Sequence, residues 1–259
     1  MLKGLYTAYT GMINEQNRMD VMTNNLANAT TVGYKKEGAT SQSFDDILTV
    51  KIKDASVGSK IAQAIGMKNP GVKIGENYTD FTQGSFRVTN NIYDLALEGE
   101  GFFAVEFKNK AGEISTKYTR AGQFALNKEG YLVTQDGDYV LDTNGRHIRL
   151  NTLTDSSILP DGTIQQDKQA VAKLQITDFE DYDYLEKYGE AYYEPVAGAK
   201  TKESQAYVRS GYLEMSNVSV VSEMVNLISI TRAYESNQKI LKTYDSSLEI
   251  AVNQLGKVQ

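Results

Sequence analysis

Residues 219–256, SVVSEMVNLISITRAYESNQKILKTYDSSLEIAVNQLG, carry the strongest regular pattern in the chain. An apolar or aromatic side chain recurs at every seventh position, at Val220, Leu227, Tyr234, Leu241, Leu248 and Leu255. Seven residues are close to two turns of an α-helix, so these side chains share one helix face. Ser219 is placed to cap the N-terminus, Glu223 lies in the first turn, and Gly256 can end the helix. The pattern therefore predicts one long amphipathic helix.

The face that surrounds this row is less regular. Met224 flanks the row on one side, and Tyr244 flanks it on the other. Residues 218–230 are apolar on nearly every side of the predicted helix. A two-stranded coiled coil needs only one apolar seam, so apolarity all round predicts burial among several neighbours.

A second helix is predicted at the N-terminus. Its apolar row again has a spacing of seven residues and consists of Leu5, Met12, Met19 and Leu26. Leu2 and Tyr9 begin a neighbouring row, which continues with polar residues. The helix should end near residues 28–30, because two β-branched threonines, a valine and Gly33 follow.

The middle of the chain has the pattern of β-structure. Residues 102–107, FFAVEF, form a strand candidate, and Glu129-Gly130, Asp136-Gly137 and Asn144-Gly145 are turn signals at short intervals. These intervals predict an antiparallel meander. The predicted fold is therefore α+β, with an antiparallel β-rich central domain flanked by two helices that pair in a coiled-coil-like bundle. We expect residues 1–35 and 217–259 to form a terminal helical domain. Residues 36–75 should be an extension or linker, and residues 76–216 a central β domain. The shape of residues 150–205 stays open.

Both predicted helices need a partner surface. A single amphipathic helix is marginally stable in water, and the apolar side chains stabilise it only when they are buried. An intramolecular helical hairpin and packing between subunits satisfy this need equally well, because heptad rows do not specify their partners. The predicted interface consists of Leu2, Leu5, Tyr9, Met12, Met19, Leu26, Val220, Met224, Leu227, Tyr234, Leu241, Tyr244, Leu248 and Leu255.

Composition argues against several classes of function. The 259 residues carry a net charge of −6, and no run of Lys and Arg suggests a nucleic-acid partner. No apolar stretch is long enough to span a membrane, and polar residues near the N-terminus interrupt any signal peptide. Cysteine is absent and His147 is the only histidine, which leaves little material for thiolate, triad or His-rich metal chemistry. We expect no enzymatic activity, no metal and no cofactor.

Three local motifs have a chemical and a structural interpretation. Gly99-Glu100-Gly101 resembles the start of a phosphate-binding loop, but it lacks a third glycine and precedes a strand, which favours a tight turn. Asp136-Gly137-Asp138 lacks the other ligands of a calcium loop and favours a hairpin turn. Residues 178–193 mix six carboxylates with tyrosines, which suits either a carbohydrate-binding cleft or an exposed acidic face.

An asparagine-rich stretch closes the first predicted helix. Asn24, Asn25 and Asn28 lie there, followed by Gly33. Asparagine disfavours helix interiors because its amide competes for backbone groups. The stretch therefore predicts either simple fraying or a hydrogen-bonding junction between the helix and the next segment.

Four blocks of the sequence resemble the bacterial flagellar rod and hook protein family. They occur in the family's order and cover both ends and the middle of the chain. The blocks are NNLANATTVGYK at residues 24–35, DLALEGEGFF at 94–103, YTRAGQF at 118–124, and GYLEMSNV at 211–218 with EMV at 223–225 and RAYESN at 232–237. Chain length and the single modest central domain favour a rod subunit over a hook protein. The likeness is greatest to the distal-rod and proximal-rod subunits, which the resemblance does not separate.

This resemblance implies a structural, axial component of the flagellar basal body. It implies terminal helices that pack as coiled coils in the inner wall of a tube, with the β domain outside them. Copies of the chain and neighbouring axial proteins would be its partners, and the flagellar type III apparatus would export it without a cleaved signal. A hook or hook-junction protein of the same family is the near alternative, and a carbohydrate-binding β module is the distant one.

Overall fold

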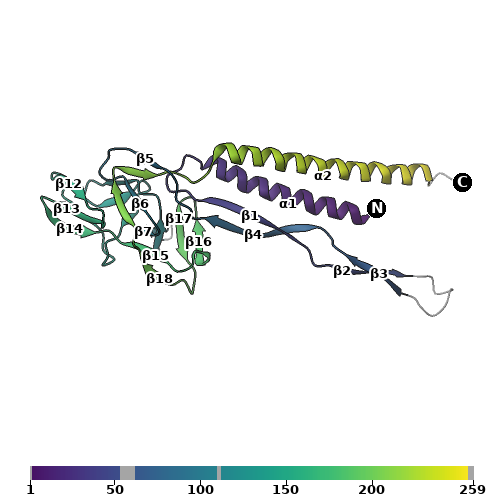
Figure 1. Cartoon of the computed structure of the whole chain (residues 1–259), viewed down its shortest axis with the longest axis horizontal. Helices are drawn as coiled ribbons and strands as arrows, with labels where there is room; N and C mark the ends of the chain where they lie inside the picture. The colour runs from purple at the N-terminus through teal and green to yellow at the C-terminus, as the bar shows by residue number, and fades with distance from the viewer. Residues whose placement is uncertain (1, 53–61, 110–111, 256–259) are drawn as a thin grey trace. The chain divides into compact units, whose positions relative to one another are not determined.

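The structure is a computed structural model that describes residues 2–52, 62–109 and 112–255 (Figure 1). The side chains of Leu2 and Leu255, both predicted at the assembly interface, lie outside the described part. The chain has a helix at each end and a β-rich middle, which confirms the α+β prediction. It divides into two compact units that alternate along the sequence.

The first unit contains both helices and the strands that follow the first helix. It comprises Met1–Leu26, Glu37–Thr79 and Val220–Gln259. Its elements are α1 (Leu2–Ala27), β1 (Lys36–Ser43), β2 (Ile47–Ile52), β3 (Ala62–Lys68), β4 (Val72–Asp80) and α2 (Val220–Leu255). Strand β1 pairs with β4, and β2 pairs antiparallel with β3. The segment predicted as an extension or linker thus contains two short two-stranded ribbons.

Local sequence explains where the two helices begin and end. Helix α2 starts directly after Ser219, the predicted cap, and runs for 36 residues. Helix α1 ends at Ala27, where β-branched residues follow and Gly33 has a φ of +70°. A left-handed conformation at this point favours glycine, so the helix cannot continue through it.

The second unit is built around strand β7 (Phe102–Lys108). The unit comprises Ala27–Lys36 and Asp80–Ser219. Its main sheet has the order β16-β17-β8-β7-β11-β10-β9, and β15 also pairs with β7. These strands are β8 (Ile114–Thr119), β9 (Phe124–Leu126), β10 (Leu132–Thr134), β11 (Tyr139–Val140), β15 (Ile176–Phe179), β16 (Leu185–Tyr188) and β17 (Tyr192–Pro195). Strands β9, β10 and β11 pair antiparallel in sequence order, so the predicted meander is confirmed.

Smaller sheets complete the second unit. Three strands form a separate sheet in the order β12-β13-β14, β18 pairs with β15, and β6 and β5 pair with β19 and β20 respectively. These strands are β5 (Phe86–Val88), β6 (Leu95–Glu98), β12 (Ser156–Ile158), β13 (Thr163–Gln166), β14 (Gln169–Lys173), β18 (Thr201–Glu203), β19 (Tyr207–Ser210) and β20 (Tyr212–Glu214). The segment 150–205, whose shape the sequence left open, supplies β12, β13, β14 and β18.

Alternation along β7 supplies two separate cores. Phe103 and Val105 point into one apolar cluster, which also holds Leu95. Phe102 and Ala104 point into the other. Successive side chains of a strand face opposite sides of a sheet, so a strand buried on both sides must be apolar at every position. This requirement accounts for the continuous apolar run FFAV, all four residues of which are buried.

Phe102 should be a main determinant of the stability of the second unit. Its ring is fully buried, and its centroid lies 5.4 Å from that of Tyr193 and 5.8 Å from those of Phe81 and Tyr182. Phe102→Ala should lower the free energy of unfolding by about 3–5 kcal/mol, measured by urea denaturation. Ile114→Ala in β8, where the side chain is 64% exposed, is the control and should change it by less than about 0.5 kcal/mol. Equal losses would contradict this assignment.

Candidate functional site: a buried ion-pair network

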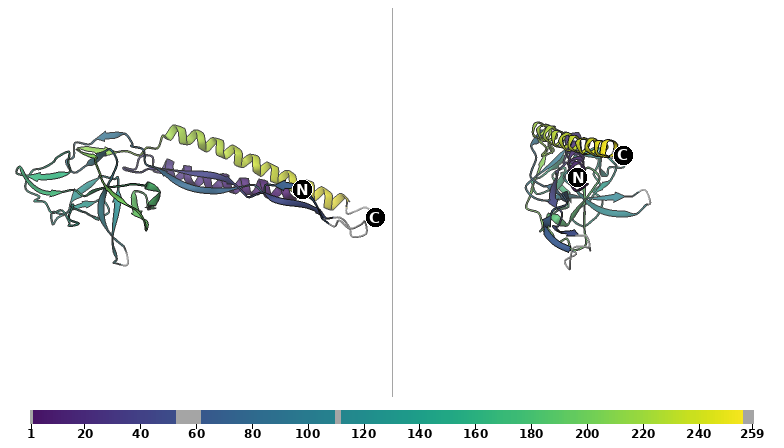
Figure 2. Two further views of the ribbon diagram at one scale, coloured as in Figure 1. Left: turned by 60° about the horizontal axis from the view of Figure 1, so that its bottom comes forward. Right: turned by 90° about the vertical axis from the view of Figure 1, so that its right-hand side faces the viewer.

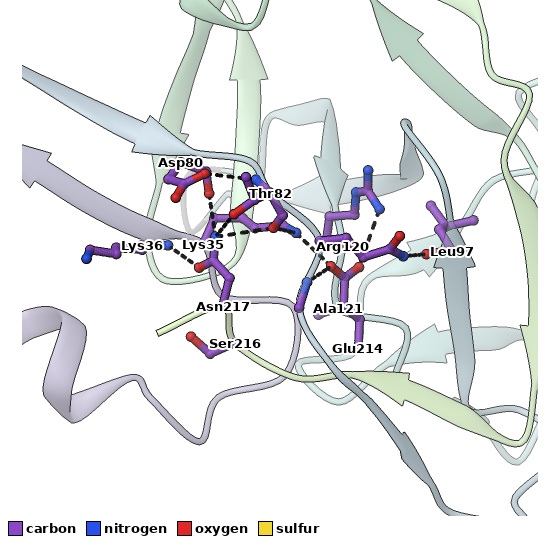
Figure 3. A network of polar contacts seen from close by, with 12 residues as sticks. Lys35, Lys36, Asp80, Thr82, Leu97, Arg120, Ala121, Glu214, Ser216 and Asn217 are labelled. Atoms are coloured by element: carbon purple, nitrogen blue, oxygen red, sulfur yellow. Dashed lines mark hydrogen bonds and ion pairs between the residues drawn. The ribbon is translucent and has the colours of Figure 1, made fainter. Parts of the chain in front are cut away.

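A buried carboxylate, Glu214, is the centre of a polar network in the second unit (Figure 3). Glu214 ends β20, and Lys35 follows Tyr34 in the segment after α1. The Lys35 Nζ lies 2.6 Å from the Glu214 Oε1, and the two side chains are 1% and 0% exposed. The other oxygen, Oε2, lies 3.4 Å from the Arg120 Nη1. One carboxylate therefore faces two buried cations that lie far from it in the sequence.

Backbone groups complete the shell of the network. The Gly84 N–H donates to the Glu214 Oε1 at 3.0 Å, and Lys35 donates to the Thr82 carbonyl at 2.8 Å. The Gly33 N–H donates to the backbone carbonyl of Glu214 at 2.9 Å. A buried ion pair needs its remaining donors and acceptors to be satisfied, and these bonds meet that need for Glu214 and Lys35. The Nε of Arg120 has no hydrogen-bond partner in the described part of the chain.

Asn217 extends the network toward the start of α2. Its Oδ1 accepts from the Lys36 N–H at 2.8 Å, and its Nδ2 donates to the Asp80 carbonyl at 2.8 Å. The same Nδ2 donates to the Thr82 Oγ1 at 3.0 Å. Three chain segments thus meet in the second unit, namely the one that follows α1, the one that follows β4 and the one that precedes α2 (Figure 3).

Close backbone packing requires glycine at two positions beside the network. A Cβ on Gly33 would clash with the backbone of Arg120 and Ala121, and a Cβ on Gly84 would clash with the Met215 carbonyl. Both positions bring the segments that carry the network into direct backbone contact. Gly33, predicted as part of a helix junction, therefore lies at a point where two segments of the second unit meet.

Burial and charge act in opposite directions on the lysine. Burial lowers the pKa of Lys35, because desolvation disfavours the charged amine, and the neighbouring Glu214 carboxylate raises it in part. Arg120 has its guanidinium over the Phe102 ring, 5.3 Å from the centroid. The network is therefore anchored on one of the two apolar cores and has no exposed reactive group.

The asparagines predicted at the junction take different positions. Asn25 is fully buried in the first unit, where its Nδ2 donates to the Glu37 carbonyl at 2.7 Å and its Oδ1 accepts from the Glu37 N–H at 2.9 Å. Asn28 is buried in the second unit and its Oδ1 accepts from the Thr31 hydroxyl at 3.1 Å. Asn24 is exposed. Asn25 and Asn28 thus hold the chain on the two sides of the point where α1 ends, each within its own unit.

The predicted interface residues of the helices lie on half-buried or exposed faces of the first unit. Tyr9, Val220 and Met224 are 47%, 42% and 51% exposed. The others with described side chains are partly buried, namely Leu5, Met12, Met19, Leu26, Leu227, Tyr234, Leu241, Tyr244 and Leu248. Whether they form an interface stays a prediction.

Contacts between the helices involve Tyr244, which the sequence predicted at the interface, and Gly4, Gly11 and Asn237, which it did not indicate. A Cβ on Gly4 would clash with the Tyr244 side chain, and a Cβ on Gly11 would lie 3.1 Å from the Asn237 Nδ2. A cavity of about 210 Å³ is lined in part by Arg18 of α1 and Ile230 of α2. In Figures 1 and 2 the two helices run side by side.

The motifs with a possible chemical role have structural roles in the second unit. Gly99-Glu100-Gly101 is the tight turn between β6 and β7, with both glycines at positive φ. Asp178 is 2% exposed and accepts from the Tyr182 hydroxyl at 2.8 Å, while Lys202 lies 3.4 Å away. His147 lies 3.0 Å from Glu106 and stacks on Tyr139. No cluster that could hold a metal ion occurs among the described residues.

A cavity of about 430 Å³ in the second unit is bordered by the Asp136-Gly137 turn. The Tyr192 hydroxyl lies there, 3.0 Å from the Asp138 Oδ2 and 3.3 Å from the Asp136 Oδ2. Burial raises the pKa of Asp138, and the hydrogen bond from Tyr192 lowers it in part. The pair of carboxylates is thus the hairpin turn that the sequence favoured, with one phenol between them.

Sequence reasoning missed Lys35, Arg120 and Glu214 as a group. Each was part of a block that carried the family resemblance, but nothing in the local pattern joined them. The sequence shows only that Lys35 and Glu214 directly follow Tyr34 and Leu213, and the structure shows that both of these neighbours are buried. A charge inside a buried segment requires a partner of opposite sign.

Three family models match the chain in order. The model described as flagella basal body rod protein matches residues 5–35, the flagellar hook protein FlgE/F/G D1 domain matches 96–166, and the flagellar basal body rod FlgEFG protein C-terminal matches 209–255. The fold and these three matches therefore define the class of the chain, which is that of flagellar axial proteins.

Full-length relatives make the assignment more specific. The flagellar basal-body rod protein FlgG of Bacillus subtilis is 34% identical over 98% of this chain and 99% of its own length. FlgF of Caulobacter vibrioides is 33% identical over 100% of both chains, and the flagellar hook-basal body complex protein FlhO of Bacillus subtilis is 31% identical over 100% of both. The chain belongs to the flagellar basal-body rod protein family.

Glu214 should contribute far more to stability than an exposed glutamate. Glu214→Gln keeps the shape of the side chain but leaves Lys35 and Arg120 buried without a counter-charge. Removing one partner of a buried pair costs about 3–5 kcal/mol, which urea denaturation would measure. The matched control is Glu98→Gln, since Glu98 pairs with Arg209 at 2.6 Å but is 44% exposed, and it should have little effect. Similar small losses for both variants would contradict the assigned role.

Asp138 should make stability depend on pH. A raised pKa in the folded state means that the stabilising contribution of Asp138 is present at low pH and is lost as pH rises through the folded pKa. Asp138→Asn should therefore raise the melting temperature at pH 7, and its difference from the parent should vanish near about pH 3. Thermal unfolding followed by circular dichroism checks this, with Asp155→Asn, an exposed residue, as control. A variant that is less stable than the parent at pH 7 would contradict it.

Proposed function

We propose that this chain is a structural subunit of the bacterial flagellar basal-body rod. In this proposal it assembles with copies of itself and with neighbouring axial proteins through its terminal helices and forms part of a tube that transmits torque. The names of the relatives support the rod assignment, because FlgG and FlgF are both basal-body rod proteins. The location that follows is the flagellar basal body.

The observation that carries the assembly role is the exposed apolar surface at the start of α2. Val221, Val225 and Ile228 are 75%, 60% and 52% exposed. Among the described residues of this 36-residue helix, only Glu223 and Ile230 are buried. A contiguous apolar surface of this kind marks a protein–protein contact, because burying it releases about 25 cal/mol per Å².

We infer that α1 and α2 pair antiparallel in a coiled-coil-like manner within one subunit. Gly4 lies against Tyr244, and Gly11 lies against Asn237. Moving seven residues toward the C-terminus of α1 thus corresponds to moving seven residues toward the N-terminus of α2. Arg18 and Ile230, one further step in each direction, line the same cavity. Heptad spacing on both helices in opposite directions is the pattern of an antiparallel pair.

The remaining parts of the proposal follow from the family. The role is structural and involves no catalysis. The subunit would be exported by the flagellar type III apparatus without a cleaved signal, and no described helix is long and apolar enough to cross a membrane. The terminal residues 1–35 and 217–259 would form the assembly domain, 36–75 the extension, and 76–216 the central β domain.

Two deletions test the proposal. Removing residues 1–30 or residues 217–259 should abolish rod assembly and motility, because each deletion removes one of the two assembly helices. Motility in soft agar and electron microscopy of purified basal bodies give the readout. Normal rods and swimming in both deletion strains would refute the proposal.

A single substitution separates assembly from folding. Val225→Glu puts a charge on a side chain that is 60% exposed, so the isolated chain should keep its melting temperature while motility is lost. Ser246→Glu, also at an exposed position on α2, is the control and should leave motility intact. Normal motility of the Val225→Glu strain would contradict the assignment of the exposed start of α2 to the assembly interface.

A further inference from the structure

The β1–β4 ribbon runs beside α1 within the first unit (Figures 1 and 2), and polar side chains of α1 hydrogen-bond to it. Asn25 makes two hydrogen bonds to the backbone of Glu37 in β1, at 2.7 and 2.9 Å. The Asn14 Nδ2 donates to the Ser41 Oγ at 3.0 Å, and the Thr7 hydroxyl donates to the Pro70 carbonyl at 3.4 Å. The contacts are spread over most of the length of the helix.

The three polar residues share one line on the helix surface. From Thr7 to Asn14 is seven residues, and from Asn14 to Asn25 is eleven, which are two and three helical turns to within about 20°. The apolar row of Leu5 and Met12 lies about 160–180° from Asn14 around the helix axis. The ribbon is therefore held by hydrogen bonds and not by the apolar row.

Asn14 is poorly suited to stabilise the helix. It is 3% exposed, yet its Oδ1 has no hydrogen-bond partner in the described part of the chain. A buried amide oxygen without a partner is unfavourable, and asparagine is a weak helix former. An apolar residue would be more stable at this position, so stability alone does not explain the amide.

Buried asparagines have a known physical effect of another kind. In coiled coils a single buried asparagine reduces stability but selects one register, because only one alignment satisfies its amide. The same reasoning holds for a helix against a ribbon. Sliding α1 by four residues would place Val21 opposite the Glu37 backbone, and a valine side chain can neither donate to nor accept from it.

We propose that Asn14 and Asn25 are register-determining residues that fix the axial position of the β1–β4 ribbon on α1. The close approach at the far end of the ribbon agrees with a single register, because Gly71 packs directly against the Thr10 side chain and has no room for a Cβ. The inference deepens the proposed function, since the register decides which ribbon residues lie beside which turn of an assembly helix.

The register can be measured in the isolated full-length chain. The sequence contains no cysteine, so Gln16→Cys on α1 and Ser43→Cys at the end of β1 give two unique spin-label positions, both exposed. Double electron–electron resonance then reports their distance distribution. The parent with both asparagines should give one narrow distance.

Replacing Asn14 tests the register role directly. Asn14→Leu should leave the melting temperature unchanged or raise it, while a second distance appears, shifted on the scale of one helical turn, about 5.4 Å. Asn25→Ala should broaden the distribution further. Asn17→Leu makes the same substitution at an exposed position of α1 and should keep the single distance.

Three results would overturn the inference. These are a single unshifted distance in the Asn14→Leu, Asn25→Ala double variant, a broad distribution in the parent, or a lower melting temperature of Asn14→Leu with an unchanged distance. The last would show that Asn14 only stabilises the unit. None of these measurements involves rod assembly, so a result that overturns the register inference leaves the proposed function intact. The motility of the deletion strains tests the proposed function separately.

Discussion

The ion-pair network around Glu214 is the interaction on which the second unit depends. One carboxylate with no solvent exposure lies between Lys35 and Arg120, and hydrogen bonds made by Gly84 and Asn217 join the same segments. Burial of three charged groups is unfavourable unless each is paired, so the three segments are stable only together. The network therefore fixes where the chain enters and leaves the second unit.

Segments that lie far apart in the sequence are held together by different interactions in the two units. In the second unit, two apolar cores on opposite faces of β7 provide most of the stabilisation, and the charged network selects the arrangement of the segments. In the first unit, Asn25 and Asn14 hold a narrow ribbon through hydrogen bonds. A two-stranded ribbon is only marginally stable by itself in water, so its attachment to α1 is required for its order.

Different faces of the two helices make different contacts. One face of α1 binds the ribbon, Gly4 and Gly11 lie against α2, and the start of α2 leaves Val221 and Val225 exposed. The start of α2 thus keeps large apolar side chains at the surface, where the proposed assembly would bury them. This distribution is what a subunit needs if it must fold alone and then assemble.

Periodicity in the sequence was enough to predict the helices at both ends, the β-rich middle and its meander, because these patterns depend on residues close together in the chain. Asn25 could be singled out as anomalous, but its partner could not be named. Lys35 and Glu214 are 179 residues apart, and no local pattern pairs two charges at that separation. Residues 150–205 stayed open because their strands are short and two of them, β15 and β17, also pair with distant strands. The sequence by itself thus determined the two terminal helices and the β-rich character of the middle. Only the tertiary structure decided which buried charges and amides meet, since that depends on contacts that exist only after the chain has folded.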